Sequence, residues 1–197
     1  MIKAVTLQTL RVCLRISAVF LALAVAGCGP IISFGGDDPA GEIYALRYSS
    51  DYASYDVNAP IIYLSNPQML DGLDGTSIAV MLPDGQRTLL AGASWSAHIS
   101  DLIREYVSHS LGAQTGANII SEGGLDIKAG CRLGLKVWSF ELAAGATAAT
   151  DAVNIALQFS LVRMKDSVLL SHPTFSQSVR VSGAGIGAVV DGFKAAM

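Results

Sequence analysis

The chain has 197 residues, and its 13 basic and 16 acidic side chains give it a formal net charge of −3. It contains no run of lysine or arginine, which argues against nucleic-acid binding and against a polybasic contact with anionic lipid. The length fits one ordinary domain with enough residues to form a hydrophobic core.

The first 27 residues have the composition of a bacterial secretion signal. Lys3, Arg11 and Arg15 are the only charged residues there, and an apolar segment follows from Ile16 to Ala26. This segment is too short for a membrane-spanning helix, which requires about 20 apolar residues. Residues 1–27 are therefore predicted to be removed and to contribute nothing to the fold.

The apolar segment ends in the sequence LALAVAGC, which has the form of a lipobox. A small residue, Gly27, directly precedes Cys28, and aliphatic Val25 stands three positions before the cysteine. We predict cleavage between Gly27 and Cys28 and acylation of the cysteine, with palmitate as a typical chain. Each buried acyl CH₂ contributes about 0.8 kcal/mol, so two or three chains would hold the protein on a membrane almost permanently. The alternatives are an ordinary secretory signal with a coincidental cysteine, or an uncleaved anchor.

Removal of the signal makes the chain more acidic. Three of the 13 basic residues precede Cys28 and none of the 16 acidic residues does, so the remaining charge is 10 − 16 = −6. Of the three cysteines, Cys13 would be lost and Cys28 lipidated, which leaves Cys131 alone and excludes an intramolecular disulfide. Cys131 is predicted to be a small buried residue, and pairing between two chains is the alternative.

Residues 28–41 are predicted to form the lipidated cysteine and a flexible tether, because GPIISFGGDDPAG has glycine, proline and paired aspartate without a sustained period. Residues 42–197 are expected to form the folded domain.

The first half of this domain predicts short strands separated by Asp, Gly and Pro. The predicted strands are Ile43 to Tyr48, Pro60 to Leu64, Ser77 to Leu82 and Thr88 to Ala91. Pro83-Asp84-Gly85 is a typical turn.

The stretch from about Trp95 to Leu111 predicts the longest helix. Its apolar side chains recur at the spacing of one buried face and are Ile99, Leu102, Ile103, Tyr106, Val107 and Leu111. We expect Ser94 or Ser96 to cap the start of this helix and Gly112 to end it.

The second half predicts antiparallel strands. Apolar and polar residues alternate from Leu133 to Val137 and from Val153 to Leu161, which is typical of strands with one packed and one wetter face. Lys165-Asp166-Ser167 predicts a hairpin turn into Val168 to Leu170, and a further strand is expected from Phe175 to Val181.

A closing helix is expected between Gly183 and Met197, with Ile186, Val189, Val190 and Phe193 on its apolar face. Together these elements predict an α/β fold. It is a single-domain sandwich with a mixed, largely antiparallel sheet, packed by a long central helix and a short C-terminal helix.

The sequence offers few groups that could carry out chemistry. His98 and His109 are eleven residues apart on the predicted helix, about 16 Å along its axis, so they cannot bind one metal ion. Ser94 and Ser96 lie at a strand-to-helix junction, but neither has the flanking glycines of a nucleophile elbow. We therefore predict no catalytic residue, no metal and no cofactor, and a protein that is not an enzyme.

The order of several short motifs resembles the ABC-type transport auxiliary lipoprotein family, whose members accompany mammalian-cell-entry (MCE) type transporters and include the paraquat-inducible lipoprotein C. The matching pieces are Tyr44-Ala45-Leu46, Pro67 with Leu70 and Asp71, Ile78 to Val80, Leu89, Trp95 opening a long helix that ends at Leu111, and Phe140-Glu141. The match departs at Ser96-Ala97-His98, where the family often has small and acidic residues, and in the glycine-rich C-terminal segment.

The resemblance implies a membrane-anchored periplasmic subunit that assists an MCE-domain protein, a permease and an ATPase in moving lipid or another hydrophobic substrate. Trp95 is then expected in the core or in a pocket wall, and Tyr44, Tyr63 and Trp95 are the candidate partner or pocket contacts. Homo-oligomer formation is left open. The other function classes are an unrelated outer-membrane assembly or structural lipoprotein, and a lipid-anchored hydrolase using Ser94 or Ser96.

The position after the lipidated cysteine bears on localisation. Gly29 stands where enteric bacteria commonly have an aspartate that retains lipoproteins in the inner membrane. The periplasmic face of the outer membrane is therefore the predicted location, with the inner membrane as the alternative.

Overall fold

The computed structural model describes residues 41–49, 56–70, 72–121 and 127–197. Gly41–Met197 is one compact unit. The predicted cleavage site at Gly27, the predicted lipidation site at Cys28 and the predicted tether lie outside the described residues.

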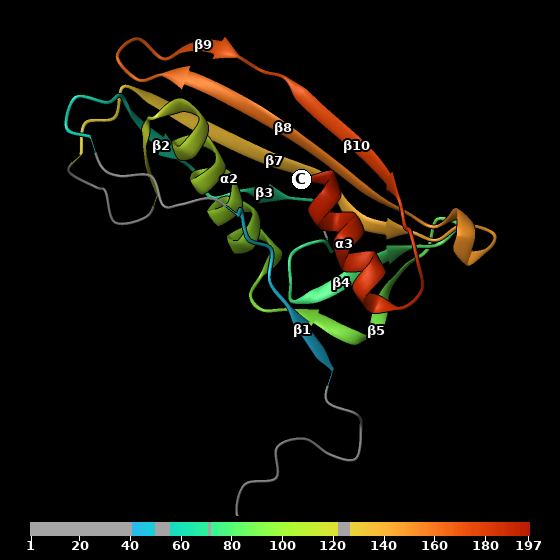
Figure 1. The fold of residues 1–197 in the computed structure, drawn as a ribbon. Coiled ribbons are helices and arrows are strands. Elements are labelled where there is room, and N and C mark those ends of the chain that lie inside the picture. Colours follow the sequence, from blue (N-terminus) through green and yellow to red (C-terminus); the bar gives the residue numbers. More distant parts are fainter. Residues whose placement is uncertain (1–40, 50–55, 71, 122–126) are drawn as a thin grey trace, which may run out of the picture. The chain divides into compact units, whose positions relative to one another are not determined.

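The described residues form a ten-stranded sheet with two α-helices and a short 3₁₀ turn (Figure 1). The strands are β1 (Glu42–Tyr44), β2 (Ile61–Leu64), β3 (Gln68–Met69), β4 (Ser77–Met81), β5 (Arg87–Trp95), β6 (Asn118–Ile120), β7 (Cys131–Ala143), β8 (Ala152–Arg163), β9 (Val168–Ser171) and β10 (Thr174–Arg180). The helical elements are α2 (Ile99–Thr115), η1 (Ala148–Thr150) and α3 (Ile186–Ala196).

Strand β7 organises the sheet. One of its edges pairs antiparallel with β8, from Cys131 opposite Arg163 to Ala143 opposite Ala152. Its other edge pairs in parallel with β2, β3 and β4 in turn. Beyond β8 lie β9 and β10, both antiparallel to it, while β5 pairs antiparallel with β4 and in parallel with β1. The sheet is mixed and its longest pairings are antiparallel, which confirms the predicted fold class.

Both α-helices pack on the same face of this sheet (Figure 1). The alternation predicted for β8 decides which residues point to them, because side chains on a strand alternate between the two faces. Val153, Ile155 and Leu157 are buried, and the intervening residues of β8 are less so. On β7 the alternation is interrupted by a bulge between Val137 and Ser139, which leaves Trp138 as the extra residue.

The core contains a cluster of three aromatic rings. Trp95 at the end of β5 is 3% exposed, and it packs against Phe140 of β7 and Phe193 of α3. Val189 and Val190 are also buried on α3, as the predicted apolar stripe requires. The C-terminal helix is therefore confirmed, and burial of its apolar face against the sheet holds it in place.

The long helix begins later than predicted. Residues up to Trp95 continue β5, and α2 starts at Ile99 with His98 as its N-cap. The predicted serine caps are wrong, because the backbone N–H groups of the first turn are bound by a different segment. The N–H of Ile99 donates to the carbonyl oxygen of Gly75 at 3.0 Å, and that of Ser100 donates to Asp74 Oδ1 at 3.3 Å.

The same helix also ends later than predicted. Gly112 is buried inside α2, and the helix continues to Thr115. Gly116 then takes a left-handed conformation with φ of 66°, and its N–H donates to the carbonyl oxygen of Gly112. Such a conformation strains residues with a side chain, so Gly116 and not Gly112 is the residue that suits the helix end.

The remaining differences are local. The hairpin turn before β9 is confirmed, with Ser167 at a φ of 57°. Strand β1 is shorter than the predicted range, and β3 and β6 were not predicted. These two strands have two and three residues, too few to show a periodic pattern. Cys131, at the start of β7, is half-buried with a free thiol.

Candidate functional site

An apolar groove lies between α2 and the β8–β10 part of the sheet, beside the end of α3. Its volume is about 380 Å³, which falls within the range of small-molecule sites. The residues that line it are Tyr106, Val107, Ser110 and Leu111 of α2, Ile155, Leu157 and Phe159 of β8, Phe175, Ser176 and Gln177 of β10, and Ala196 and Met197. We refer to this set as the apolar groove.

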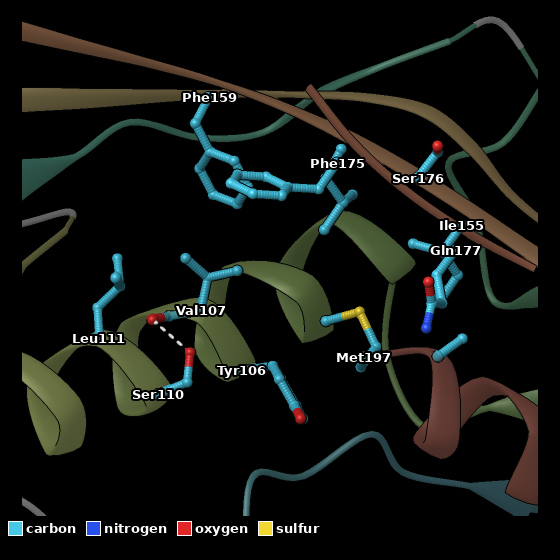
Figure 2. Close-up of a pocket in the computed structure, with 12 residues that line it drawn as sticks. Tyr106, Val107, Ser110, Leu111, Ile155, Phe159, Phe175, Ser176, Gln177 and Met197 are labelled. Atoms are coloured by element: carbon cyan, nitrogen blue, oxygen red, sulfur yellow. Dashed lines mark hydrogen bonds between the residues drawn. The ribbon is translucent and has the colours of Figure 1, made fainter. Parts of the chain in front are cut away.

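Two phenylalanine rings form the sheet side of the groove. Phe159 and Phe175 make an edge-to-face contact with 5.8 Å between ring centroids. Figure 2 shows these rings across the groove from Val107 and Leu111 of α2, with Met197 at the α3 end. Phe175 is 60% exposed, so a large apolar side chain remains in contact with solvent at this site. This is the kind of surface that a hydrophobic ligand or partner would cover.

Strand register and helical spacing together build the groove. Phe175 of β10 lies opposite Leu157 of β8, so both side chains are on the face that carries the helices. Val107 and Leu111 are four residues apart on α2 and share one side of the helix. One wall of the groove is therefore the helix-covered face of β8 and β10, and the other wall is the side of α2 that carries Val107 and Leu111.

A few polar groups adjoin the apolar surface. The hydroxyl of Ser110 donates to the carbonyl oxygen of Val107 at 3.2 Å, a bond drawn in Figure 2. The ring of Tyr106 meets that of Tyr48 edge to face at 5.4 Å. Burial raises the pKa of Tyr106, and the nearby Tyr48 adds to the effect. Tyr106 therefore keeps its proton at neutral pH and is able to donate a hydrogen bond.

The three candidate contact residues from the sequence lie elsewhere. Trp95 is buried in the aromatic core. Tyr44 is half-buried on β1, and its hydroxyl donates to the carboxylate of Glu42, which raises the pKa of Tyr44. Tyr63 is half-buried on β2, between β6 and β7. None of the three lines the apolar groove.

The groove was not predicted as a site, although one signal for it exists. Strand β10 reads TFSQSVR, and Phe175 is the only aromatic residue among these polar neighbours. An isolated aromatic on an edge strand is too common to indicate a binding site by itself. Phe175 lies opposite Leu111 and Val107 only because α2 packs on this part of the sheet.

The residues considered for catalysis take structural positions. Asp74 binds the start of α2, and its Oδ1 is 3.7 Å from His98 Nδ1. Ser94 pairs with Ile43 and Ser77 in the sheet, and the N–H of Ser96 donates to the carbonyl oxygen of Tyr44. Within the described ranges, no three histidine, cysteine or acidic side chains gather as metal ligands would. The described helices include none with the length and apolar composition of a membrane span.

Comparison with known families decides the classification. The model for the ABC-type transport auxiliary lipoprotein component matches residues 46–197. The chain belongs to this family. The resemblance seen in the order of its motifs is thereby confirmed, and the chain is an auxiliary lipoprotein component of ABC-type transport. This role fits a protein without enzymatic activity and a place in the cell envelope.

Solved structures support the fold of this auxiliary lipoprotein. It is similar to protein XCC0632 from Xanthomonas campestris, with a TM-score of 0.61, 17% sequence identity, and coverage of 80% of this chain and 86% of that one. An uncharacterized protein gives a TM-score of 0.62 at 14% identity, with coverage of 80% and 91%. No curated protein matches the sequence.

Proposed function

We propose that this auxiliary lipoprotein is the membrane-anchored periplasmic subunit of an MCE-type ABC transport system. In this role it assists the movement of phospholipid or another hydrophobic substrate across the envelope. Family membership supports the association with a transporter. The observation that supports a hydrophobic substrate is the apolar groove, where Phe175 is 60% exposed beside a cavity of about 380 Å³.

In this proposal the work is divided among subunits. The permease and its ATPase supply the energy, and the MCE-domain protein provides the route between the membranes. The acyl chains on Cys28 keep the auxiliary domain at the periplasmic face of the outer membrane. The domain would then receive or position the substrate close to the anchor.

We assign an acyl chain to the apolar groove. Phe159, Phe175, Val107 and Leu111 present hydrocarbon from both sides, and covering this surface removes apolar area from water. Each Å² so covered contributes about 25 cal/mol. Gln177 lies two residues after Phe175 on the same face of β10 and also lines the groove, so its side-chain amide would bind the polar end of a lipid.

Affinity purification from the native envelope tests the transporter association. The full lipoprotein with a C-terminal tag is crosslinked in cells and purified in mild detergent. Recovery of an MCE-domain protein together with a permease and an ATPase is expected. Recovery of only unrelated outer-membrane components would overturn the proposal in favour of an assembly or structural lipoprotein. Membrane fractionation of the same strain tests the outer-membrane location.

Binding of a fluorescent fatty acid tests the groove separately. Phe175→Ser is expected to weaken binding roughly tenfold, about 1.4 kcal/mol, because it removes the exposed apolar wall. Leu89→Ser is the matched control, since Leu89 is 59% exposed on β5 and does not line the groove. Equal affinity of the two variants would show that the groove is not the binding site.

A further inference from the structure

A second pocket lies over β7 and β8 on the face of the sheet opposite the helices. Its volume is about 410 Å³. We refer to it as the polar pocket, and the residues that line it on β7, β8 and the segment between β9 and β10 include Arg132, Gly134, Lys136, Gln158, Ser160 and His172. It shares β8 with the apolar groove, because consecutive residues of that strand point to opposite faces.

The strand register brings these six residues together. Arg132, Gly134 and Lys136 alternate along β7. Ser160 lies opposite Gly134, and Gln158 lies opposite Lys136. His172, between β9 and β10, completes the group, because its Nδ1 is 2.8 Å from the hydroxyl of Ser160. Gln158 is held in the same way by a 2.9 Å hydrogen bond to Thr174.

Gly134 separates the two cations, and packing does not explain its presence. A Cβ at this position would meet the Cβ of Ser160 at 3.7 Å and its carbonyl oxygen at 3.8 Å, which are ordinary contacts. Its φ is not positive, so the backbone does not require glycine either. Glycine weakens the middle of a strand and often marks a place where a ligand approaches the backbone. Here it leaves the floor of the polar pocket open between Arg132 and Lys136.

The charge of the polar pocket is unlike that of the chain as a whole. None of the described residues that line it is acidic, although the chain carries 16 acidic residues against 13 basic ones. Among the described ion pairs, Arg87, Arg104 and Arg163 each contact a carboxylate, whereas Arg132 and Lys136 do not.

The ammonium group of Lys136 rests on an aromatic ring. Its Nζ lies 3.7 Å from the centre of the Trp138 ring, and Trp138 is 40% exposed. An ammonium group on a tryptophan face is attracted to the ring and still has N–H donors that point away from it. The polar pocket therefore presents an ammonium group and a guanidinium group on either side of an open floor.

We propose that the polar pocket binds an anionic ligand through a phosphate group. Arg132 would bind two phosphate oxygens with its planar guanidinium, and Lys136 would supply the second positive charge. The hydroxyl of Ser160 and the ring of His172 provide further hydrogen bonds. This chemistry is common to a phospholipid headgroup and to free phosphate. The site stands on its own residues and does not depend on the transport partners or on the apolar groove.

Tryptophan fluorescence of the full lipoprotein in non-ionic detergent tests this site, because Lys136 rests on Trp138. The probes are inorganic phosphate, glycerol 3-phosphate, and short-chain phosphatidylglycerol, with short-chain phosphatidylcholine as the zwitterionic comparison. Saturable binding of any anionic probe, weakened by added salt, is the expected result. Preference for phosphatidylglycerol over inorganic phosphate identifies a lipid headgroup, and equal binding identifies free phosphate. Binding of none of the anionic probes would overturn the proposal.

Substitutions locate the binding. Arg132→Gln and Lys136→Gln are each expected to weaken it at least tenfold. Arg180→Gln is the matched control, because Arg180 is exposed on β10 and does not line the polar pocket. A loss for Arg180→Gln equal to that for Arg132→Gln would also overturn the proposal, because it would indicate attraction to general surface charge.

Gly134→Val separates binding from folding. Valine has the higher β-propensity, so the thermal midpoint is expected to stay the same or rise, while its branched side chain fills the floor of the pocket and abolishes binding. Unchanged binding by a folded Gly134→Val protein would contradict the site. Because purification of the transporter is measured separately, failure of this site is distinguishable from failure of the proposed transport function.

Discussion

The rings of Trp95 and Phe193 meet edge to face, with 5.2 Å between their centroids and an interplanar angle of 87°. Phe140 stacks on Phe193 at 4.7 Å, so the three rings join β5, β7 and α3. Aromatic pairs of this kind contribute about 0.5–1.5 kcal/mol beyond the area they bury. This cluster fixes α3 on the sheet, and with it the end of the apolar groove that Met197 lines.

Phe193→Ala is therefore expected to destabilise the domain by about 3–5 kcal/mol, because Phe193 is fully buried and its removal leaves a cavity. Urea unfolding followed by circular dichroism measures the change. Phe175→Ala is the control. Because Phe175 is 60% exposed, this substitution should lower the free energy of unfolding far less. Equal costs for the two variants would mean that α3 does not depend on this cluster.

Asp74→Ala is expected to destabilise the domain by about 1 kcal/mol. The carboxylate of Asp74 accepts a hydrogen bond from the N–H of Ser100, as an N-cap side chain does within a helix. Thermal unfolding provides the measurement. Asp74→Asn keeps an oxygen acceptor and should recover most of the loss, whereas no recovery would show that the contact does not act as a cap.

Removal of Arg87 should leave a buried charge without its main partner. Arg87 Nε lies 3.0 Å from Glu141 Oε2, and the side chain of Glu141 is only 10% exposed. Arg87→Met is expected to cost about 1–3 kcal/mol, because an unsatisfied buried polar group keeps its full desolvation penalty. Adding Glu141→Leu should restore much of this stability in a double-mutant cycle. A second loss that adds to the first would indicate that the two residues act independently.

A titration followed by phenolate absorbance should show that two tyrosines, Tyr106 and Tyr44, lose their protons at a higher pH than an ordinary tyrosine does. Burial raises the pKa of Tyr106, and the hydrogen bond to Glu42 raises that of Tyr44. A raised pKa in the folded state favours the neutral phenol. The stability that Tyr106 contributes is therefore present below its ordinary pKa and is lost as the pH rises through the folded value.

Tyr106→Phe and Tyr44→Phe should each remove part of the absorbance change that occurs above the ordinary tyrosine pKa. Equilibrium unfolding of Tyr106→Phe at neutral and alkaline pH measures the linked stability, and its alkaline loss should be smaller than that of the native chain. An unchanged titration in both variants would contradict these assignments.

Local patterns predicted the elements that have enough residues to show a period. The alternation from Val153 to Leu161 predicted β8, and the stripe through Val189, Val190 and Phe193 predicted α3. The predicted start of α2 was wrong. The first backbone N–H groups of this helix donate to Asp74 and Gly75, which are more than twenty residues earlier in the chain. No local pattern reports a cap that comes from another segment.

The two pockets show where sequence information ends. The amino-acid pattern is sufficient to place Leu157 and Phe159 on one face of β8 and Gln158 and Ser160 on the other, because side chains alternate along a strand. Which of these faces the helices cover, and therefore which face holds the apolar groove, follows from the packing of α2 and α3 on the sheet and not from the pattern of one strand. The contact of His172 with Ser160 beside Arg132 and Lys136 also depends on the folded sheet, because strand register joins residues that are distant in the chain. For the same reason a chain without any run of basic residues carries a concentrated positive site.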